Sequence, residues 1–136
     1  MVAVTADTNI YISALIFAGP PRQFLLAAED ARIRLSISEA IREELRRILQ
    51  GKFAWSENEV DETLRQLAGC TELVRPTETL DVIKEDPDDN RVLECAAAAG
   101  SRFIVSSDND LLRLGQFRNI RIVKVADFMK LITALP

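Results

Sequence analysis

The chain has 136 residues, of which 48% are hydrophobic and 28% charged, and we expect a single globular domain over residues 1–136. The formal charge of −4 argues against a strongly basic nucleic-acid binder, although setting aside the acids considered below leaves a mildly basic remainder. Histidine is absent, which excludes Ser-His-Asp and Cys-His catalysis, histidine general bases and most zinc enzymes.

Nothing in the sequence favours export or a membrane. No uninterrupted apolar stretch is long enough to cross a bilayer, and the apolar start lacks a basic leader and is interrupted by Asp7 and Asn9. Cys70 and Cys95 fit no C-x-x-C motif, so we expect two reduced thiols packed in the core. We therefore expect a cytoplasmic protein without a membrane segment.

Strand-like apolar runs alternate with segments of helical periodicity, beginning with a strand at residues 2–6. Strands alternating with helices predict an α/β fold: a three-layer sandwich whose central parallel sheet of about four to five strands is covered by helices. No G-x-G-x-x-G or P-loop motif supports a dinucleotide or NTP fold. The further predicted elements, in chain order, are helices at 10–17 and 22–30, a strand at 33–37, a helix from a Ser38 cap to about 50, a helix from a capping box at 56–59 to 69, a strand at 72–74, a helix from the acidic residues 85–90 to 99, a strand at 103–106, a helix at 109–114, a strand at 120–125 and a helix at 126–135.

Two of the apolar runs lead into aspartates, Asp7 after residues 2–6 and Asp108 after residues 103–106. In a parallel sheet both would lie at the carboxyl ends of their strands, where open α/β sheets bind ligands. Each could instead be a helix N-cap, a role worth about 1 kcal/mol. For Asp7 taken alone, the cap is the favoured interpretation.

Three polar residues accompany these aspartates, and each has two interpretations. Asn9 could orient a carboxylate or cap the helix. Asp110 could be a further metal ligand or a solvated acid in the first helical turn. Ser106 could hydrogen-bond a carboxylate or a substrate phosphate, or it could be an ordinary strand residue.

Glu44 is distinguished from Glu43 by helical geometry. It lies three residues after Ile41 and four before Ile48, so it borders the apolar stripe of its helix, whereas Glu43 lies on the wet side. A carboxylate beside a stripe that faces the core costs desolvation unless it is paired. Glu44 could therefore be a site residue or an edge glutamate paired with Arg47, and the helix alone leaves both open.

The acidic residues 85–90 open the next helix. Asp86 precedes Pro87 as an N-cap precedes a first helical residue, so we interpret it as a cap that could also support a ligand. Asp89 lies three and four residues before Val92 and Leu93, on the face that the helix would bury. Asp89 is therefore the better candidate ligand.

These acids could converge on one rim of a parallel sheet. Like charges at close range raise one another's pKa, so such a cluster is stable at neutral pH only if something positive lies in it. The simplest occupant is a hard divalent cation. The set consists of Asp7, Glu44, Asp89 and Asp108.

Four segments resemble the motifs of PIN domains, in the same order and over nearly the whole chain. Residues 7–9 (DTN) look like the opening motif, and 38–45 (SEAIREEL) are similar to the second, whose glutamate falls on Glu44. Residues 86–90 (DPDDN) look like the third motif, with its ligand aspartate on Asp89. Residues 105–112 (VSSDNDLL) are similar to the fourth, with Ser106 in place of the usual threonine.

The nearest subgroup is the VapC-type set of toxin components of prokaryotic toxin–antitoxin operons. The resemblance implies a Mg²⁺- or Mn²⁺-dependent endoribonuclease, often a homodimer, that is held inactive by a cognate antitoxin. The absence of histidine agrees with it, because the family's site consists of carboxylates.

We therefore predict metal-assisted hydrolysis of RNA phosphodiesters. Asp110 would assist as a further metal ligand, Asn9 and Ser106 would orient the ligands, and Asp86 would support them. One alternative is a phosphoacceptor or phosphotransferase domain, but its D-x-D pattern is not met because Asn9 occupies the third position. Another is a catalytically silent PIN-fold binding module, against which the presence of all four acids argues. The four predicted catalytic residues and metal ligands are Asp7, Glu44, Asp89 and Asp108.

Overall fold

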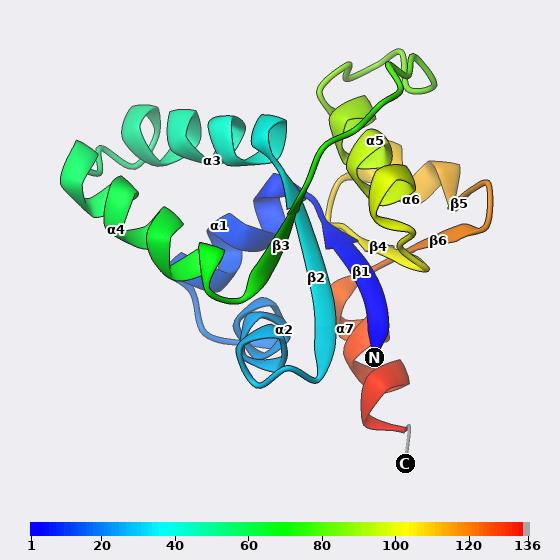
Figure 1. Ribbon diagram of the computed structural model, residues 1–136, viewed down its shortest axis with the longest axis horizontal. Helices are drawn as coiled ribbons and strands as arrows, with labels where there is room; N and C mark the ends of the chain where they lie inside the picture. Colours follow the sequence, from blue (N-terminus) through cyan, green and yellow to red (C-terminus); the bar gives the residue numbers. More distant parts are fainter. Residues whose placement is uncertain (135–136) are drawn as a thin grey trace.

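The computed structural model describes residues 1–134, which form a twisted sheet with helices on both sides (Figure 1). The predicted helix at 126–135 therefore ends, at Leu135, outside the described residues. The strands are β1 (Val2–Ala6), β2 (Ile33–Ser38), β3 (Thr71–Val74), β4 (Phe103–Val105), β5 (Gln116–Phe117) and β6 (Ile120–Val123). The helices are α1 (Thr8–Ile16), α2 (Pro20–Glu29), α3 (Glu39–Gly51), α4 (Glu57–Ala68), α5 (Asp89–Ala99), α6 (Asn109–Leu114) and α7 (Val125–Thr133).

The strand order is β3-β2-β1-β4-β6-β5, and all neighbouring strands run parallel except the β5–β6 pair. The chain first builds outward from β1 to β2 and β3, and then returns to place β4 on the other side of β1. The point between β1 and β4, where the order reverses, is where open α/β sheets form their ligand crevice.

Helices cover both faces of the sheet, as predicted. α5 packs against β1, β2, β3 and β4 on one face. On the other, the Phe128 ring of α7 meets Phe24 of α2 and Phe103 of β4 in edge-to-face contacts, with centroid distances of 5.6 and 5.5 Å. α3 and α4 extend beside the sheet as a pair linked by an ion pair of 2.9 Å between Arg46 and Asp61.

Local signals in the sequence explain most element boundaries. The Ser38 hydroxyl accepts a hydrogen bond from the Ile41 N–H at 3.3 Å and caps α3. The capping box at Ser56 is formed in both directions at the start of α4. Gly100 ends α5 with φ +66°, a conformation that costs glycine little.

Three features differ from the prediction. The sheet has six strands rather than four to five, because the two-residue β5 is too short to show any alternation. The last strand stops at Val123, since α7 begins two residues later. α5 begins at Asp89 and not near Pro87; residues 86–88 form a turn in which the Asp86 carbonyl accepts from the Asp89 N–H at 3.0 Å.

Within the described residues, no single helix is long and apolar enough to span a bilayer. α1 and α2 meet the requirements of length and composition only as a pair, and they are bent by 97° at the break between them.

Candidate active site

The carboxyl ends of β1 and β4 lie side by side. Ala6 pairs with Val105 in the parallel ladder, and the Asp7 N–H donates to the Val105 carbonyl at 3.1 Å. The residues that follow each strand are therefore neighbours in space although they are about a hundred positions apart in sequence. This register brings Asp7 next to Ser106 and Asp108.

Asp7 is buried, with 3% of its surface exposed, and both of its carboxylate oxygens accept hydrogen bonds. One oxygen caps α1 by accepting from the Ile10 N–H at 3.0 Å. The other accepts from the Ser106 hydroxyl and from the Ser107 N–H, the latter at 3.3 Å. Burial raises the pKa of Asp7, these three hydrogen bonds lower it, and the Asp108 charge raises it further. Asp7 is thus both an N-cap and part of the rim.

Three other carboxylates gather beside it. Asp86, Asp89 and Asp108 each offer an oxygen, and these oxygens all lie within 4.8 Å of one another. Asp89 is 8% exposed, and its Oδ2 is buried without a hydrogen-bond partner among the described residues. Burial, a hydrogen bond to Asp108 and the charges of Asp108, Asp86 and Asp7 raise the pKa of Asp89 to about 8. We call Asp86, Asp89 and Asp108 the carboxylate cluster.

A sequence model of the PIN domain family matches residues 3–110, which is most of the chain. The chain belongs to the PIN domain family. PIN domains are generally metal-dependent nucleases that act on RNA or other nucleic acid, so the phosphotransferase alternative is not favoured. No curated protein matches the chain significantly.

The carboxylate cluster suits the metal ion on which PIN domains depend. Hard divalent cations prefer oxygen ligands, and the cluster consists of carboxylate oxygens. The buried Asp89 oxygen that has no hydrogen-bond partner among the described residues would be satisfied by such a cation. The raised pKa of Asp89 also indicates a missing cation, because burial and the neighbouring acids make its negative charge unfavourable. The residues present therefore fit a divalent cation.

Glu44 approaches the PIN site from α3 and is half-buried. Burial and the charges of Asp88 and Asp86 raise its pKa, while a hydrogen bond from Thr8 and the Arg47 charge lower it. Glu44 therefore faces the start of α1 and the turn that carries Asp86, and it lies outside the three-residue cluster. Its neighbour Glu43 is exposed.

Two of the predicted site residues lie at the margin. Asn9 is exposed, next to Asp7 in the first turn of α1. Asp110 forms an ion pair with Arg113 at 3.0 Å, and its N–H donates to the Asp108 carboxylate at 2.8 Å. Neither belongs to the carboxylate cluster.

Sequence reasoning placed Asp86 too far from the centre of this PIN site. It was interpreted mainly as a cap, whereas its carboxylate lies in the cluster and no side chain caps α5. The reason is the turn at residues 86–88, which delays the helix and directs Asp86 back toward Asp89. The sequence gives no signal that singles out Thr8 or Asn90. In the structure Asn90 is 1% exposed and its side chain is fully hydrogen-bonded, and Thr8 lies beside Glu44.

Proposed function

We propose that this PIN domain is a Mg²⁺- or Mn²⁺-dependent endoribonuclease and the toxin of a VapC-type toxin–antitoxin pair. The observation that carries the catalytic part is the carboxylate cluster beside Asp7, with a buried oxygen of Asp89 that has no partner among residues 1–134. Asp108 also caps α6, so capping alone does not separate a site acid from a structural one. The buried Asp89 oxygen does, because a structural acid would have paired with a donor or turned to solvent.

Asp86, Asp89 and Asp108 would hold the ion, with Asp7 and Glu44 completing the ring of negative charge. When bound, a divalent cation supplies charge neutralisation at a phosphodiester and a water of lowered pKa. Mg²⁺ binds through few carboxylates and keeps several waters, which suits a cluster in which Asp86 and Asp108 are only half-buried.

The chain's own groups prepare the site. Ser106 and Ser107 hold one oxygen of Asp7, and Ser106 also accepts from the Asp108 N–H at 2.9 Å, so a single hydroxyl ties the two aspartates together. The Thr8 side chain lies beside Glu44 and lowers its pKa. Asp89 must release its proton to act as a ligand, so loading with metal is favoured as the pH rises toward 8.

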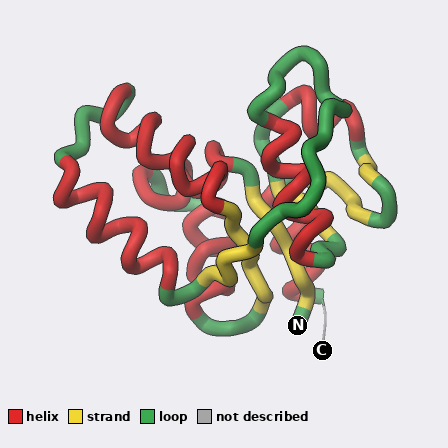
Figure 2. Tube along the Cα trace, turned by 45° about the horizontal axis from the view of Figure 1, so that its top comes forward, coloured by secondary structure: helices red, strands yellow, loops and turns green. Residues whose placement is uncertain are grey.

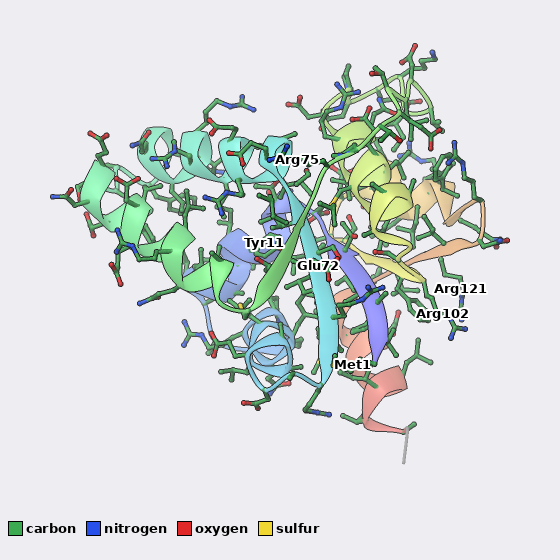
Figure 3. The ribbon with its side chains drawn as sticks, viewed as in Figure 1. Met1, Tyr11, Glu72, Arg75, Arg102 and Arg121 are labelled. Atoms are coloured by element: carbon green, nitrogen blue, oxygen red, sulfur yellow. The ribbon has the colours of Figure 1, made fainter. Side chains whose placement is uncertain are left out.

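RNA would approach along the same rim. Arg75 follows β3, ends exposed between α3 and α5 (Figure 3), and has no acidic partner among the described residues. It lines a pocket of about 380 Å³ together with Ser38 and Glu94. The Arg75 guanidinium could pair with a phosphate of the RNA backbone. This pairing would offset the repulsion between the phosphates and the acids of the rim.

The decisive experiment measures cleavage of a structured RNA with Mg²⁺ or Mn²⁺, and with EDTA. Wild type should cleave, whereas Asp89→Asn and Asp108→Asn should lose at least about 10- to 100-fold, the cost of disturbing even the supporting partners of a metal site. Asp127→Asn, which changes an exposed acid in the first turn of α7, is the matched control and should cleave normally. Equal cleavage by all four proteins would refute the assignment.

Binding distinguishes an enzyme from a catalytically silent PIN module. Calorimetric titration of wild type with Mn²⁺ should give heat that disappears in Asp89→Asn. A protein that binds no divalent cation would be a scaffold for partner contact.

The toxin role rests on the resemblance of the four PIN motifs, taken together, to the VapC-type subgroup. A homodimer and a cognate antitoxin are part of the proposal. Two free cysteines suit the reducing cytoplasm in which such a toxin would act. Expression in a bacterial host should arrest growth for wild type and not for Asp108→Asn. Growth unaffected by an active nuclease would remove the toxin role and leave the nuclease, and sedimentation would give the oligomeric state.

A further inference from the structure

The long segment 75–88, between β3 and α5, has no helix or strand of its own and arches over α5 (Figure 2). It carries Asp86, one of the three cluster carboxylates. Among its apolar side chains Ile83 is 4% exposed and Leu80 is half-buried, while Val82 is 41% exposed. Apolar burial therefore anchors the segment at Leu80 and Ile83, and polar contacts hold the part that runs on to Asp86.

Asn90, in the first turn of α5, supplies most of these contacts. Its Oδ1 accepts from the Val82 N–H at 2.8 Å and from the Ile83 N–H at 2.9 Å. Its Nδ2 donates to the Ile83 carbonyl at 2.8 Å and to the Pro87 carbonyl at 3.2 Å. A primary amide has two acceptor and two donor positions, so every one of them is used, in a side chain that is 1% exposed.

These partners bracket Asp86. Ile83 lies three residues before it and Pro87 directly after it, so the Asn90 amide holds the backbone on both sides of the carboxylate. Asp86 itself accepts from the Asp88 N–H at 3.2 Å, which tightens the turn. Backbone bonds also join the turn to the start of α5, including the one from the Asp89 N–H to the Asp86 carbonyl at 3.0 Å. Among the side chains that the structure describes, the Asn90 amide is the one on α5 that hydrogen-bonds the backbone of residues 82–87.

A second pair of contacts acts further along α5. Glu94 accepts from the Leu80 N–H at 2.8 Å, and Arg91 donates to the Leu80 carbonyl at 3.1 Å. Arg91 and Glu94 are joined to each other at 2.9 Å. These contacts fix the segment at Leu80, near its middle, whereas Asn90 fixes the part that carries Asp86.

We propose that Asn90 is a positioning residue whose side-chain amide holds Asp86 within reach of Asp89 and Asp108. The proposal rests on the proposed function, because it concerns the same carboxylate cluster. Without the amide, the Val82 and Ile83 N–H groups and the Ile83 carbonyl lose this partner, and the Pro87 carbonyl keeps only its bond from the Asn90 backbone N–H. The turn is then freer to move Asp86 away from the cluster. Asn90 acts through Asp86 and touches neither the cation nor the RNA.

The test compares wild type, Asn90→Ala and Asn90→Ser, the second as a milder change that retains one hydroxyl. Ser101→Ala is the matched control, because it removes a buried, hydrogen-bonded side chain just beyond the other end of α5, where Ser101 meets Thr5 at 2.8 Å. Three quantities are measured: hydrogen exchange of the Val82 and Ile83 amides, the Kd for Mn²⁺ by calorimetry, and cleavage of RNA at increasing Mn²⁺.

Asn90→Ala should exchange these amides faster and bind Mn²⁺ on the order of 10- to 100-fold more weakly, with Asn90→Ser between it and wild type. High Mn²⁺ should restore its cleavage, which a loss of folded protein would not allow. Ser101→Ala should keep the wild-type Kd.

An unchanged Kd in Asn90→Ala, even with faster exchange, would reduce Asn90 to a structural residue and overturn the proposal. Equal weakening in Ser101→Ala would overturn it as well, because general destabilisation would then explain the effect. Absence of Mn²⁺ binding in wild type would overturn the proposed function itself. That outcome is distinguishable from the two above, because in both of them wild type binds Mn²⁺.

Discussion

Asp7 and Asp89 are both buried carboxylates on one rim, yet their surroundings differ. Asp7 accepts hydrogen bonds from Ile10, Ser106 and Ser107, which offset part of the cost of its burial. Asp89 has a buried oxygen without any donor and shares its surroundings with two other acids. One carboxylate is therefore built into the fold, and the other is left for a ligand. A raised pKa alone would not have separated them, since both are raised.

The largest expected effect tests this difference through stability without metal. At pH 8 in EDTA, Asp89→Asn should be more stable than wild type by about 1 kcal/mol or more, because it removes a buried charge that lacks a partner. Asp7→Ala should be less stable by about 1–2 kcal/mol, because it removes the α1 cap and the hydrogen bonds from residues 106 and 107. Denaturant unfolding measures both. If the free energy of unfolding changed in the same direction in both variants, the proposed difference between Asp7 and Asp89 would be wrong.

The second effect is a dependence on pH that comes from Asp89. Its pKa is raised in the folded protein to about 8, so the stability it contributes is full below the ordinary aspartate pKa and is lost as pH rises toward 8. Metal-free wild type should therefore lose thermal stability between about pH 4 and pH 8 on this account, and Asp89→Asn should lose less. Saturating Mn²⁺ should reverse the trend, because the ion binds the deprotonated form. Melting curves in EDTA and in Mn²⁺ across this range give the result.

A third effect compares two neighbouring glutamates on α3. Glu44→Gln should reduce RNA cleavage on the order of 10-fold, because Glu44 faces Thr8 and the acidic turn and adds to the field that attracts the cation. Glu43→Gln changes an exposed residue of the same charge and should cleave like wild type. Equal rates for the two variants would place Glu44 among ordinary edge residues.

The smallest effect concerns Ser106, which joins the two regions. Ser106→Ala should weaken the hold on Asp7 and Asp108 and lower cleavage by a factor of a few, while the Mn²⁺-dependence remains. Ser101→Ala, at the other end of β4, is buried and hydrogen-bonded as well and should leave the rate unchanged. A loss of Mn²⁺ binding in Ser106→Ala would mean that the hydroxyl does more than orient the acids.

Periodicity and capping signals in the sequence predicted most of the fold. The strands at β1 and β2, the capping box at Ser56 and the glycine stops were readable because each depends on a few adjacent residues. The prediction missed β5, which is two residues long and held only by its pairing with β6. Placing Asp7 and Asp108 at strand ends was enough to bring them together, because parallel register is set by the sheet.

Side-chain roles that depend on a turn or on a distant backbone could not be predicted. The position of Asp86 follows from the path of residues 75–88, which have no periodicity from which that path could be deduced. The partners of Asn90 are backbone groups, and backbone groups leave no mark in the sequence. Likewise, helical spacing placed Glu44 beside a buried stripe but could not say that Thr8 would face it.

The strand order has a consequence for how this chain folds while it is being synthesised on the ribosome. β1 lies at the middle of the sheet, and the first three strands fill only one side of it before β4 closes the other. Domains emerge from their N-terminus onward, so a nascent chain can already arrange Asp7, Glu44 and Asp89 while Asp108 has not yet been translated. On the proposed function, the centre is completed only when β4 and Asp108 have been translated, and a product that stops before β4 should be inert toward RNA.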